Sequence, residues 1–275
     1  MKISLIQMNT QERKDANLAQ AERLIGAAVA EDRPDLVLLP EMFTMLSEDL
    51  EAKRANAEIL PARDGSNAPT GAAYGLLQRL AAQHRIHVHG GSLLERDGDQ
   101  FFNTSVAFDR SGREVARYRK IHLFDVVTPD GKQYRESANV GRGTEIVTYD
   151  LEGHTVGCSI CYDMRFPELY QALARRGAEI VVVPSAFTLQ TGKDHWEPLL
   201  RARAIETETY VLAAAQTGSF ANGNRTHYGH SLAVDPWGHV IARASDKVGF
   251  VTARLDFDLL RDVRARIPVH QHKVL

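Results

Sequence analysis

Cys161 lies where an apolar, alternating segment ends and an amphipathic segment begins. The first segment covers 154–160 and the second covers 166–177. A thiol at a strand-to-helix junction can lie near backbone N–H groups and the positive helix end, which favour the thiolate and can hold a developing oxyanion. Cys161 is therefore a candidate nucleophile. The alternative is a buried cysteine that packs as a small hydrophobic side chain.

Two further predicted strands each end at an ionisable residue. Residues 35–40 form an apolar run that ends at Glu41, and residues 113–119 form a predicted strand that ends at Lys120. Burying either charge alone is costly, so an arrangement that pairs them is favoured. Each residue alone is equally explained as a solvated side chain at the start of a loop. Taken with Cys161, the two charges fit one catalytic mechanism.

Three segments resemble the catalytic blocks of the nitrilase superfamily of carbon–nitrogen hydrolases. They are 39–43 (LPEMF), 118–125 (YRKIHLFD) and 158–168 (CSICYDMRFPE), and their order and separation also match. The resemblance continues nearly end to end through 184–187, 195–197, 201–206, 228–231 and 235–238. It implies an α/β fold, an α-β-β-α four-layer sandwich, in a single carbon–nitrogen hydrolase domain over residues 1–275.

The resemblance also implies roles for individual residues of these blocks. Glu41 is expected to act as general base, Cys161 to attack the amide carbonyl, and Lys120 to stabilise the oxyanion. Ammonia then leaves, and Glu41 activates the water that hydrolyses the thioester intermediate. The backbone N–H of Tyr162 is the expected second oxyanion donor.

Glu136 matches a second glutamate that the family places in the loop after the lysine block. Its expected role is to orient Lys120 and the substrate amide nitrogen. The alternative is a surface glutamate in a polar, glycine-containing loop.

The residues after the nucleophile indicate a branch of this superfamily. Residues 161–166 (CYDMRF) resemble the branch that holds omega-amidases and deaminated glutathione amidases, which makes nitriles poor candidates as substrates. Pro167 and the segments 228–231 and 267–272 favour deaminated glutathione amidase. The expected reaction is therefore hydrolysis of the amide of deaminated glutathione, a ketoacid amide, to acid and ammonia. The alternative within the branch is an omega-amidase acting on alpha-ketoglutaramate.

A substrate of this kind carries carboxylates, for which arginine forks are suitable partners. Arg165, four residues after the nucleophile, is the predicted substrate-binding residue. Arg201, Arg203 and Arg225 fall in segments that the family places near the rim of the pocket. Each of these arginines is also explained as a solvated or helix-surface residue.

The spacing Cys158-x-x-Cys161 supports a rival hypothesis, a thiol-disulfide oxidoreductase. Strand alternation places Cys158 on one strand face and Cys161 beyond the strand, so the two sulfur atoms need not face each other. Two cysteines are too few for a cysteine-rich zinc site. Strand alternation or a solvated tail explains the histidine pairs in 87–89 and 270–272 better than a metal site does, and the mechanism that the family resemblance implies requires no metal or organic cofactor. A binding module with a dead site is a further alternative.

Length and composition limit the remaining possibilities. The chain has 275 residues, 44% of them hydrophobic, without a polar or glycine-rich tract that would divide it. Lys and Arg number 33 against 35 Asp and Glu, so no basic surface for nucleic acid or an anionic membrane is expected. Residues 1–8 predict a first strand rather than a signal segment, and two cysteines suit a reducing cytoplasm. The expected partner is thus a small-molecule amide.

Hydrophobic periodicity predicts helices that alternate with strands, as in sheets covered by helices. The predicted helices are 17–30, 70–84, 166–176, 195–208 and 257–266. The predicted strands are 2–8, 36–40, 86–94, 102–109, 113–119, 144–150, 154–161, 179–184, 210–216, 230–243 and 248–255, with a hairpin turn at 235–238. The stretches 46–69 and 122–143 are expected to cover the pocket as lids.

The family resemblance further implies a homodimer or a higher homo-oligomer. Pairing is expected through the helix at 166–176, with Phe166, Leu169, Tyr170 and Leu173 as apolar contacts. The same apolar stripe also suits an ordinary helix that faces its own core.

Overall fold

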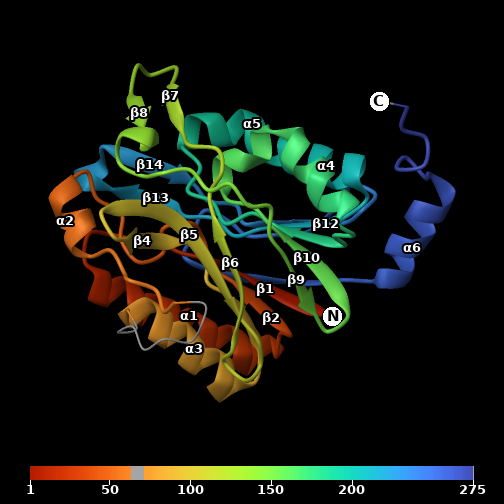
Figure 1. Cartoon of the computed structure of the whole chain (residues 1–275), viewed down its shortest axis with the longest axis horizontal. Helices are drawn as coiled ribbons and strands as arrows, with labels where there is room; N and C mark the ends of the chain where they lie inside the picture. The colour runs from red at the N-terminus through yellow and green to blue at the C-terminus, as the bar shows by residue number, and fades with distance from the viewer. Residues whose placement is uncertain (63–70, 275) are drawn as a thin grey trace.

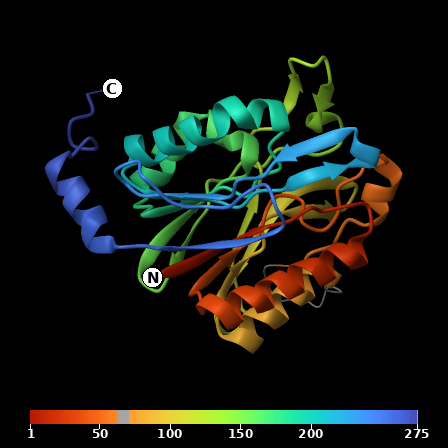
Figure 2. The same ribbon diagram turned by 180° about the vertical axis from the view of Figure 1, so that it is seen from behind.

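The computed structural model describes residues 1–62 and 71–274. Within these ranges two β-sheets lie face to face, and a layer of helices covers the outer face of each sheet (Figures 1 and 2). This arrangement confirms the predicted α-β-β-α four-layer sandwich. None of the helices in the described ranges is long and apolar enough to cross a membrane.

The first sheet has three parallel strands at its centre, β1, β2 and β3, flanked by antiparallel strands. Its strand order is β17-β1-β2-β3-β5-β4, and β6 pairs with β5. The bounds are β1 (Lys2–Gln7), β2 (Leu36–Leu38), β3 (His87–His89), β4 (Leu93–Asp97), β5 (Gln100–Phe108), β6 (Glu114–Arg119) and β17 (Gly249–Arg254). Helices α1 (Lys14–Asp32) and α3 (Ala72–His84) cover its outer face (Figure 1).

The second sheet repeats this plan with β10, β11 and β12 as parallel strands at its centre. Its order is β16-β15-β12-β11-β10-β9. The bounds are β9 (Thr148–Leu151), β10 (His154–Cys158), β11 (Ile180–Val182), β12 (Tyr210–Ala213), β15 (Leu232–Val234) and β16 (Val240–Arg243). Helices α4 (Pro167–Arg175) and α5 (Leu189–Thr207) form the layer over this sheet (Figure 1).

Strand alternation explains why the central strands are apolar on both faces. Leu36 and Leu38 of β2 belong to the core that continues into the second sheet, whereas Val37 and Leu39 belong to the core under α1 and α3. Because successive side chains of a strand point to opposite faces, a strand between two cores needs an unbroken apolar run. The sequence of β2 meets this requirement.

Short elements complete the fold at one end of the sandwich and at its edge. Within the described residues, short hairpins, a short helix and 3₁₀ turns lie between the longer elements, and α6 lies at the outer edge near the C-terminus (Figure 1). Their bounds are α2 (Leu50–Ala55), β7 (Asp125–Val127), β8 (Gln133–Arg135), η1 (Glu136–Ala138), η2 (Cys161–Arg165), β13 (Thr217–Phe220), η3 (Ala221–Gly223), β14 (Arg225–Tyr228) and α6 (Phe257–Arg266).

Most predicted elements are present, with three differences that have local causes. The predicted strand 86–94 is two strands, because the chain turns at Gly91, whose φ is +56° and whose added Cβ would lie 2.0 Å from the Pro40 carbonyl oxygen. Helix α5 begins at Leu189 rather than at 195, where Gly192 packs closely against the Tyr228 ring. The predicted strand 230–243 is the hairpin β15–β16, turning at 235–238 as expected. The expected helix start at residue 70 lies outside the described residues.

Candidate active site

Glu41, Lys120 and Cys161 all line one cavity of about 570 Å³. Glu41 follows β2 and Cys161 follows β10, two parallel strands at the centres of their sheets, and Lys120 directly follows β6. In open α/β sheets the carboxyl ends of parallel strands are the usual place for a ligand site. The structure therefore brings together the three residues that the sequence predicts, at the end of the sandwich where both sheets present strand ends.

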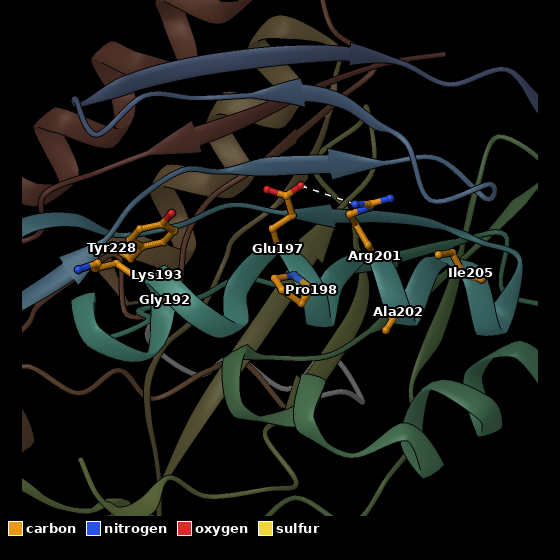
Figure 3. Close-up of a pocket in the computed structure, with 8 residues that line it drawn as sticks. All are labelled: Gly192, Lys193, Glu197, Pro198, Arg201, Ala202, Ile205 and Tyr228. Carbon is orange, nitrogen blue, oxygen red and sulfur yellow. Dashed lines mark ion pairs between the residues drawn. The ribbon is translucent and has the colours of Figure 1, made fainter. Parts of the chain in front are cut away.

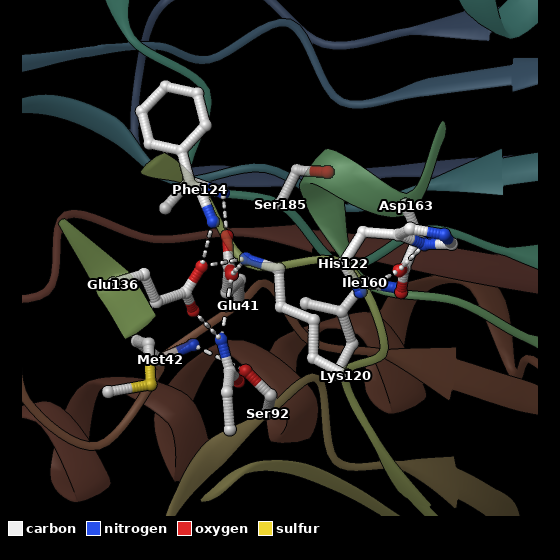
Figure 4. Close-up of polar contacts among 12 residues, drawn as sticks. Glu41, Met42, Ser92, Lys120, His122, Phe124, Glu136, Ile160, Asp163 and Ser185 are labelled. Atoms are coloured by element: carbon white, nitrogen blue, oxygen red, sulfur yellow. Dashed lines mark hydrogen bonds and ion pairs between the residues drawn. The ribbon is translucent and has the colours of Figure 1, made fainter. Parts of the chain in front are cut away.

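A lysine between two carboxylates forms the centre of this site. Lys120 Nζ lies 2.9 Å from Glu41 Oε1 and 2.8 Å from Glu136 Oε2 (Figure 4). The Asn103 side-chain amide donates to both carboxylates, at 2.9 Å to Glu41 Oε1 and 3.1 Å to Glu136 Oε1. The backbone N–H of Phe124 donates to Glu136 Oε2 at 2.7 Å. The two glutamates and the lysine are thus held as one hydrogen-bonded group.

Glu41 is fixed on its other side by the backbone of the second sheet. The N–H of Ala186 donates to Glu41 Oε2 at 2.9 Å, and the Gln216 side-chain amide donates to the Glu41 carbonyl oxygen at 2.9 Å. Met42, the next residue, has a φ of 53°. A positive φ is unfavourable for such a side chain, so the turn that aims Glu41 into the cavity depends on these contacts.

Cys161 lies in a sharp turn at the start of η2, with a φ of 47°. Its N–H donates to the Pro184 carbonyl oxygen at 2.9 Å. A strained backbone at a nucleophile is the arrangement that exposes a reactive side chain at the end of a sheet. The predicted strand-to-helix junction is present, with a 3₁₀ turn between β10 and α4.

A buried carboxylate holds the turn that carries Cys161. Asp163 accepts hydrogen bonds from the Tyr118 hydroxyl at 2.7 Å and from the backbone N–H groups of Ile160 and His122, each at 2.9 Å (Figure 4). Asp163 is completely buried. Since Tyr118 and His122 flank Lys120 in sequence, this carboxylate also ties the lysine segment to the cysteine segment.

The electrostatics differ from the expectation of a ready-made thiolate. Burial, followed by the charge of Glu41, raises the pKa of the Cys161 thiol well above its ordinary value, although the charge of Lys120 opposes this. Burial alone would lower the pKa of Lys120, but the carboxylates of Glu136 and Glu41 outweigh it and raise that pKa well above the ordinary value. These directions do not support the expected thiolate, because burial and Glu41 favour the protonated thiol of Cys161. The thiol keeps its proton until a base accepts it, and the lysine stays charged.

These groups provide the three functions that acyl transfer from an amide needs. Glu41 can act as the base and Cys161 as the thiol nucleophile. The charged ammonium group of Lys120 can stabilise the oxyanion of the tetrahedral intermediate. Protonation of the leaving nitrogen requires an acid, which Glu41 becomes once it has accepted the thiol proton.

The sequence matches the carbon–nitrogen hydrolase family over residues 2–265. The chain belongs to the carbon–nitrogen hydrolase family. This family membership, together with the relatives described below, identifies the chain as an enzyme that hydrolyses carbon–nitrogen bonds other than peptide bonds.

Relatives of similar length carry two related amidase names. A deaminated glutathione amidase of Synechocystis sp. is 40% identical over 274 residues, which cover 98% of this chain and 96% of the relative. Omega-amidase NIT2-B of Xenopus laevis is 35% identical over 272 residues, which cover 99% of this chain and 94% of the relative. The crystal structure of Saccharomyces cerevisiae Nit3, a member of branch 10 of the nitrilase superfamily, has a TM-score of 0.87 at 32% identity, covering 98% of this chain and 94% of that one.

The predicted arginines of this hydrolase have different surroundings. Arg165 is not among the cavity-lining residues; its guanidinium lies over the rings of Phe187 and Tyr162 and contacts His195. Arg201 and Arg203 donate to backbone carbonyl groups, of Gly238 and Met164 respectively. Arg225, in contrast, lines the cavity.

Both predicted lids contribute to the cavity wall. From the first stretch, several described residues between Leu46 and Arg54 line it, and the part at 63–69 lies outside the described residues. From the second stretch, Phe124 and the region 133–140 line it, carried by the hairpin β7–β8 and by η1.

Cys158 and the histidine pairs lie away from the cavity lining. Cys158 is buried in β10, where burial raises the pKa of its thiol to about 12, and both cysteines are free. This position gives no support to the oxidoreductase hypothesis, which needs a reactive thiol pair. His87 and His89 are buried on β3, and His270 contacts the Thr207 carbonyl oxygen.

Sequence reasoning missed Asn103 and Lys53. Asn103 joins the two glutamates from within β5, where nothing in the local pattern separates it from an ordinary strand residue. Lys53 lies on α2, a six-residue helix that the periodicity did not predict. A search for polar residues on otherwise buried strands would have found Asn103, because a buried amide requires partners.

Proposed function

We propose that this hydrolase is a cysteine amidase that cleaves deaminated glutathione through a thioester on Cys161. The observation that carries the proposal is the contact of Lys120 with Glu41 at 2.9 Å and Glu136 at 2.8 Å beside Cys161 in one cavity. The names of the relatives, including the Synechocystis protein, support this choice of substrate.

In the first half-reaction Glu41 accepts the thiol proton while the sulfur of Cys161 bonds to the amide carbonyl carbon. The carbonyl oxygen becomes an oxyanion, which Lys120 Nζ and the backbone N–H of Tyr162 stabilise. Collapse of this intermediate breaks the C–N bond, and protonated Glu41 donates its proton to the leaving nitrogen. Glu136 keeps Lys120 oriented throughout, through its 2.8 Å contact.

In the second half-reaction water hydrolyses the thioester. Glu41, again a carboxylate, accepts a proton from water, whose oxygen bonds to the acyl carbon. The C–S bond then breaks, and the thiol of Cys161 regains its proton. No metal or organic cofactor takes part in this proposed sequence of steps.

The leaving group depends on which amide is bound, and this corrects the expectation of ammonia. In deaminated glutathione the scissile nitrogen belongs to cysteinylglycine, so that dipeptide leaves and 2-oxoglutarate is the acid released. Ammonia leaves only from a primary amide such as alpha-ketoglutaramate. Both substrates place the same 2-oxoglutaryl group on Cys161.

The cavity suits an anionic substrate of this size. Its volume of about 570 Å³ lies within the range of small-molecule sites. Five cationic side chains line it against three carboxylates, although the whole chain has a net charge of −2. His227 on the same wall is neutral near pH 7, because burial lowers its pKa to about 4.

Omega-amidase activity on alpha-ketoglutaramate is the second candidate. The Xenopus relative carries that name at 35% identity, and the shared acyl group makes the same chemistry sufficient. The two activities differ only in the space and charge that the cavity offers to the leaving group.

The discriminating experiment measures all products from each amide. Wild-type enzyme is given deaminated glutathione, alpha-ketoglutaramate, a simple aliphatic amide and a nitrile, and 2-oxoglutarate, cysteinylglycine and ammonia are quantified. We expect the highest kcat/KM on deaminated glutathione, with equal amounts of 2-oxoglutarate and cysteinylglycine. A preference for alpha-ketoglutaramate would move the assignment to omega-amidase, and turnover of none of them would contradict the amidase proposal.

We also propose a cytoplasmic, homodimeric enzyme with one domain over residues 1–275. Two free cysteines support the reducing compartment. Of the four predicted contacts, Leu169, Tyr170 and Leu173 are buried in the protein's own core, and the partly buried Phe166 stacks on the His122 ring, so α4 does not offer its apolar stripe to a partner. Exposed apolar side chains lie instead on α5, with Leu189 41% and Ile205 50% exposed, and these support pairing through α5.

A further inference from the structure

Lys53 is a cation on the cavity wall without a direct hydrogen-bond or ion-pair partner among the described residues. It lies on α2, it is partly buried, and its side chain lines the same cavity as Cys161. Its ammonium group makes neither a hydrogen bond nor an ion pair with any residue in 1–62 and 71–274. A partly buried lysine normally pays for lost hydration with a partner, so an unpaired one facing a ligand cavity indicates a missing anion.

The carboxylates nearest to Lys53 are already engaged. Glu136 accepts from Lys120, Asn103 and the Phe124 N–H. Glu48, the other carboxylate on this wall, accepts from Arg225 at 2.8 Å. The charges of Glu136, Glu48 and Asp49 act on Lys53, but none of these carboxylates forms an ion pair with it, and the first two are hydrogen-bonded to other groups.

Arg225 lies on the same wall and is also only partly satisfied. Its Nε donates to Glu48, and its guanidinium lies 4.3 Å from the centroid of the Tyr134 ring. Nη1 is shielded from solvent and has no hydrogen-bond partner among the described residues. A guanidinium held by one edge on a carboxylate and by one face on an aromatic ring is fixed in place, where its charge can meet a carboxylate of a bound substrate.

We propose that Lys53 and Arg225 form a carboxylate-binding pair that holds the terminal carboxylate of the substrate's acyl chain while Cys161 attacks the amide at the other end. The inference rests on the proposed amidase function and specifies its substrate class: amides of dicarboxylic acids, rather than amides of neutral acids. Deaminated glutathione and alpha-ketoglutaramate both carry this carboxylate.

The pair acts on binding and not on bond breaking. The contacts of Lys120, Glu41 and Glu136 do not include Lys53 or Arg225, so removing the pair leaves the acyl-transfer group in place. A carboxylate held equally in the ground state and the transition state lowers KM and leaves kcat nearly unchanged. This split separates a binding role from a general structural one.

The test compares two amides with five-carbon acyl chains, glutaramate and pentanamide, of which only the first has a terminal carboxylate. Both release ammonia, so one assay measures both. Lys53→Met and Arg225→Gln are each expected to raise KM for glutaramate about 10- to 100-fold, the usual size for a charged hydrogen bond, with kcat within about threefold. We expect kcat/KM for pentanamide to stay within about twofold.

Matched variants control for charge and for folding. Lys193 lies on α5 in a separate groove on the surface, beside Glu197 and Tyr228 (Figure 3), and Lys193→Met makes the same substitution away from the cavity. Lys193→Met should leave KM and kcat unchanged for both glutaramate and pentanamide. Lys53→Arg keeps the cation and should restore most of the glutaramate affinity. Thermal unfolding of every variant identifies any that do not fold.

Three results would overturn the inference. The first is an unchanged KM for glutaramate in both folded variants. The second is a fall in kcat/KM for pentanamide as large as the fall for glutaramate. The third is a raised KM for deaminated glutathione with an unchanged KM for glutaramate, which would assign the pair to the carboxylate of the leaving cysteinylglycine.

A direct binding measurement separates this inference from the proposed function. Calorimetric titration of glutarate into Cys161→Ser protein reports the carboxylate site without turnover. We expect binding that weakens about 10-fold or more when Lys53→Met is added. If wild-type enzyme hydrolyses no amide but this binding difference is present, the proposed function fails and the carboxylate site stands.

Discussion

Asn103 is the residue on which the two glutamates of the site depend. Its amide donates to Glu41 at 2.9 Å and to Glu136 at 3.1 Å. Asn103→Asp would place a third carboxylate against these two, and Lys120 is the one cation that forms ion pairs with them among the described residues. We expect kcat on deaminated glutathione to fall more than about 100-fold, against about 10-fold for Asn103→Ala, which removes the donor without adding charge. Equal losses in the two variants would show that like-charge repulsion is not the cause.

The pKa of Lys53 gives a pH dependence with a defined sign. Burial, together with Arg225, lowers this pKa below 10.5, although Glu136, Glu48 and Asp49 raise it. The cation is complete at low pH and is lost as pH rises through the lowered pKa, so KM for glutaramate should increase at alkaline pH. The pH profile of KM for pentanamide, which has no terminal carboxylate, shows the contribution of all other titrating groups. In Lys53→Arg the KM for glutaramate should stay flat, and a rise there would exclude Lys53 as its source.

Single residues of the site were predictable where their chemistry is visible in the local pattern. Glu41 and Cys161 follow apolar segments, Lys120 follows a strand that also carries charged side chains, and the structure places all three in one cavity. The protonation of Cys161 was not predictable, because it depends on burial and on Glu41, which lies 120 positions earlier in the sequence. Arg165 was predicted because it lies four positions after the nucleophile in the sequence, but it does not line the cavity. Arg225, on a hairpin from another part of the chain, does.

At the scale of elements, Asp163 links the lysine segment to the cysteine turn. Its carboxylate accepts from the Tyr118 hydroxyl, the His122 N–H and the Ile160 N–H while completely buried. Asp163→Ala leaves these donors unsatisfied, so we expect the free energy of unfolding to fall by roughly 3–5 kcal/mol and kcat to fall with it. Denaturant unfolding measures the first quantity.

Tyr118→Phe is the matched control for this prediction. It removes one donor and leaves the two backbone hydrogen bonds and the 2.8 Å contact of His122 Nδ1 with Asp163, so the loss should be only about 1–2 kcal/mol. A loss in Tyr118→Phe as large as that in Asp163→Ala would indicate that packing of the ring, and not the carboxylate, supports the turn.

Elements with long periodic patterns were predictable, and short ones were not. Helix α6 has the predicted bounds at 257–266, whereas α2 and the hairpins β7–β8 and β13–β14 were missed. Short elements owe their stability to tertiary contacts that a local pattern does not contain. The start of α3 illustrates this, because the carboxylate of Glu58, distant in sequence, accepts from the N–H groups of Ala73 and Tyr74.

At the scale of the molecule, the two sheets explain why one site draws on the whole chain. Glu41 and Lys120 come from the first sheet and Cys161 from the second, so the cavity exists only when both sheets pack against each other. The four-layer arrangement was predictable from the resemblance of the catalytic blocks. Periodicity alone gives an α/β protein, since it does not state which strands share a sheet.

The proposed homodimer leads to a prediction at the same scale. Ile205 on α5 is 50% exposed, and a charge there would be buried if α5 meets a partner. We expect wild-type protein to sediment as a dimer and Ile205→Glu to shift it toward monomer, with Leu259→Glu, the same kind of substitution at a 36% exposed position on α6, as a matched control. Dimers of undiminished stability in Ile205→Glu would place the interface elsewhere.

The central claim, that one cysteine carries out amide hydrolysis, is tested most directly by comparing two cysteine variants. Release of 2-oxoglutarate from deaminated glutathione is measured for wild type, Cys161→Ala and Cys158→Ala under reducing conditions. We predict that Cys161→Ala abolishes release, and that Cys158→Ala, whose sulfur lies in the core of β10, keeps most of it. Release by folded Cys161→Ala at the wild-type rate would contradict the account, and an equal loss in folded Cys158→Ala would favour a function of the cysteine pair.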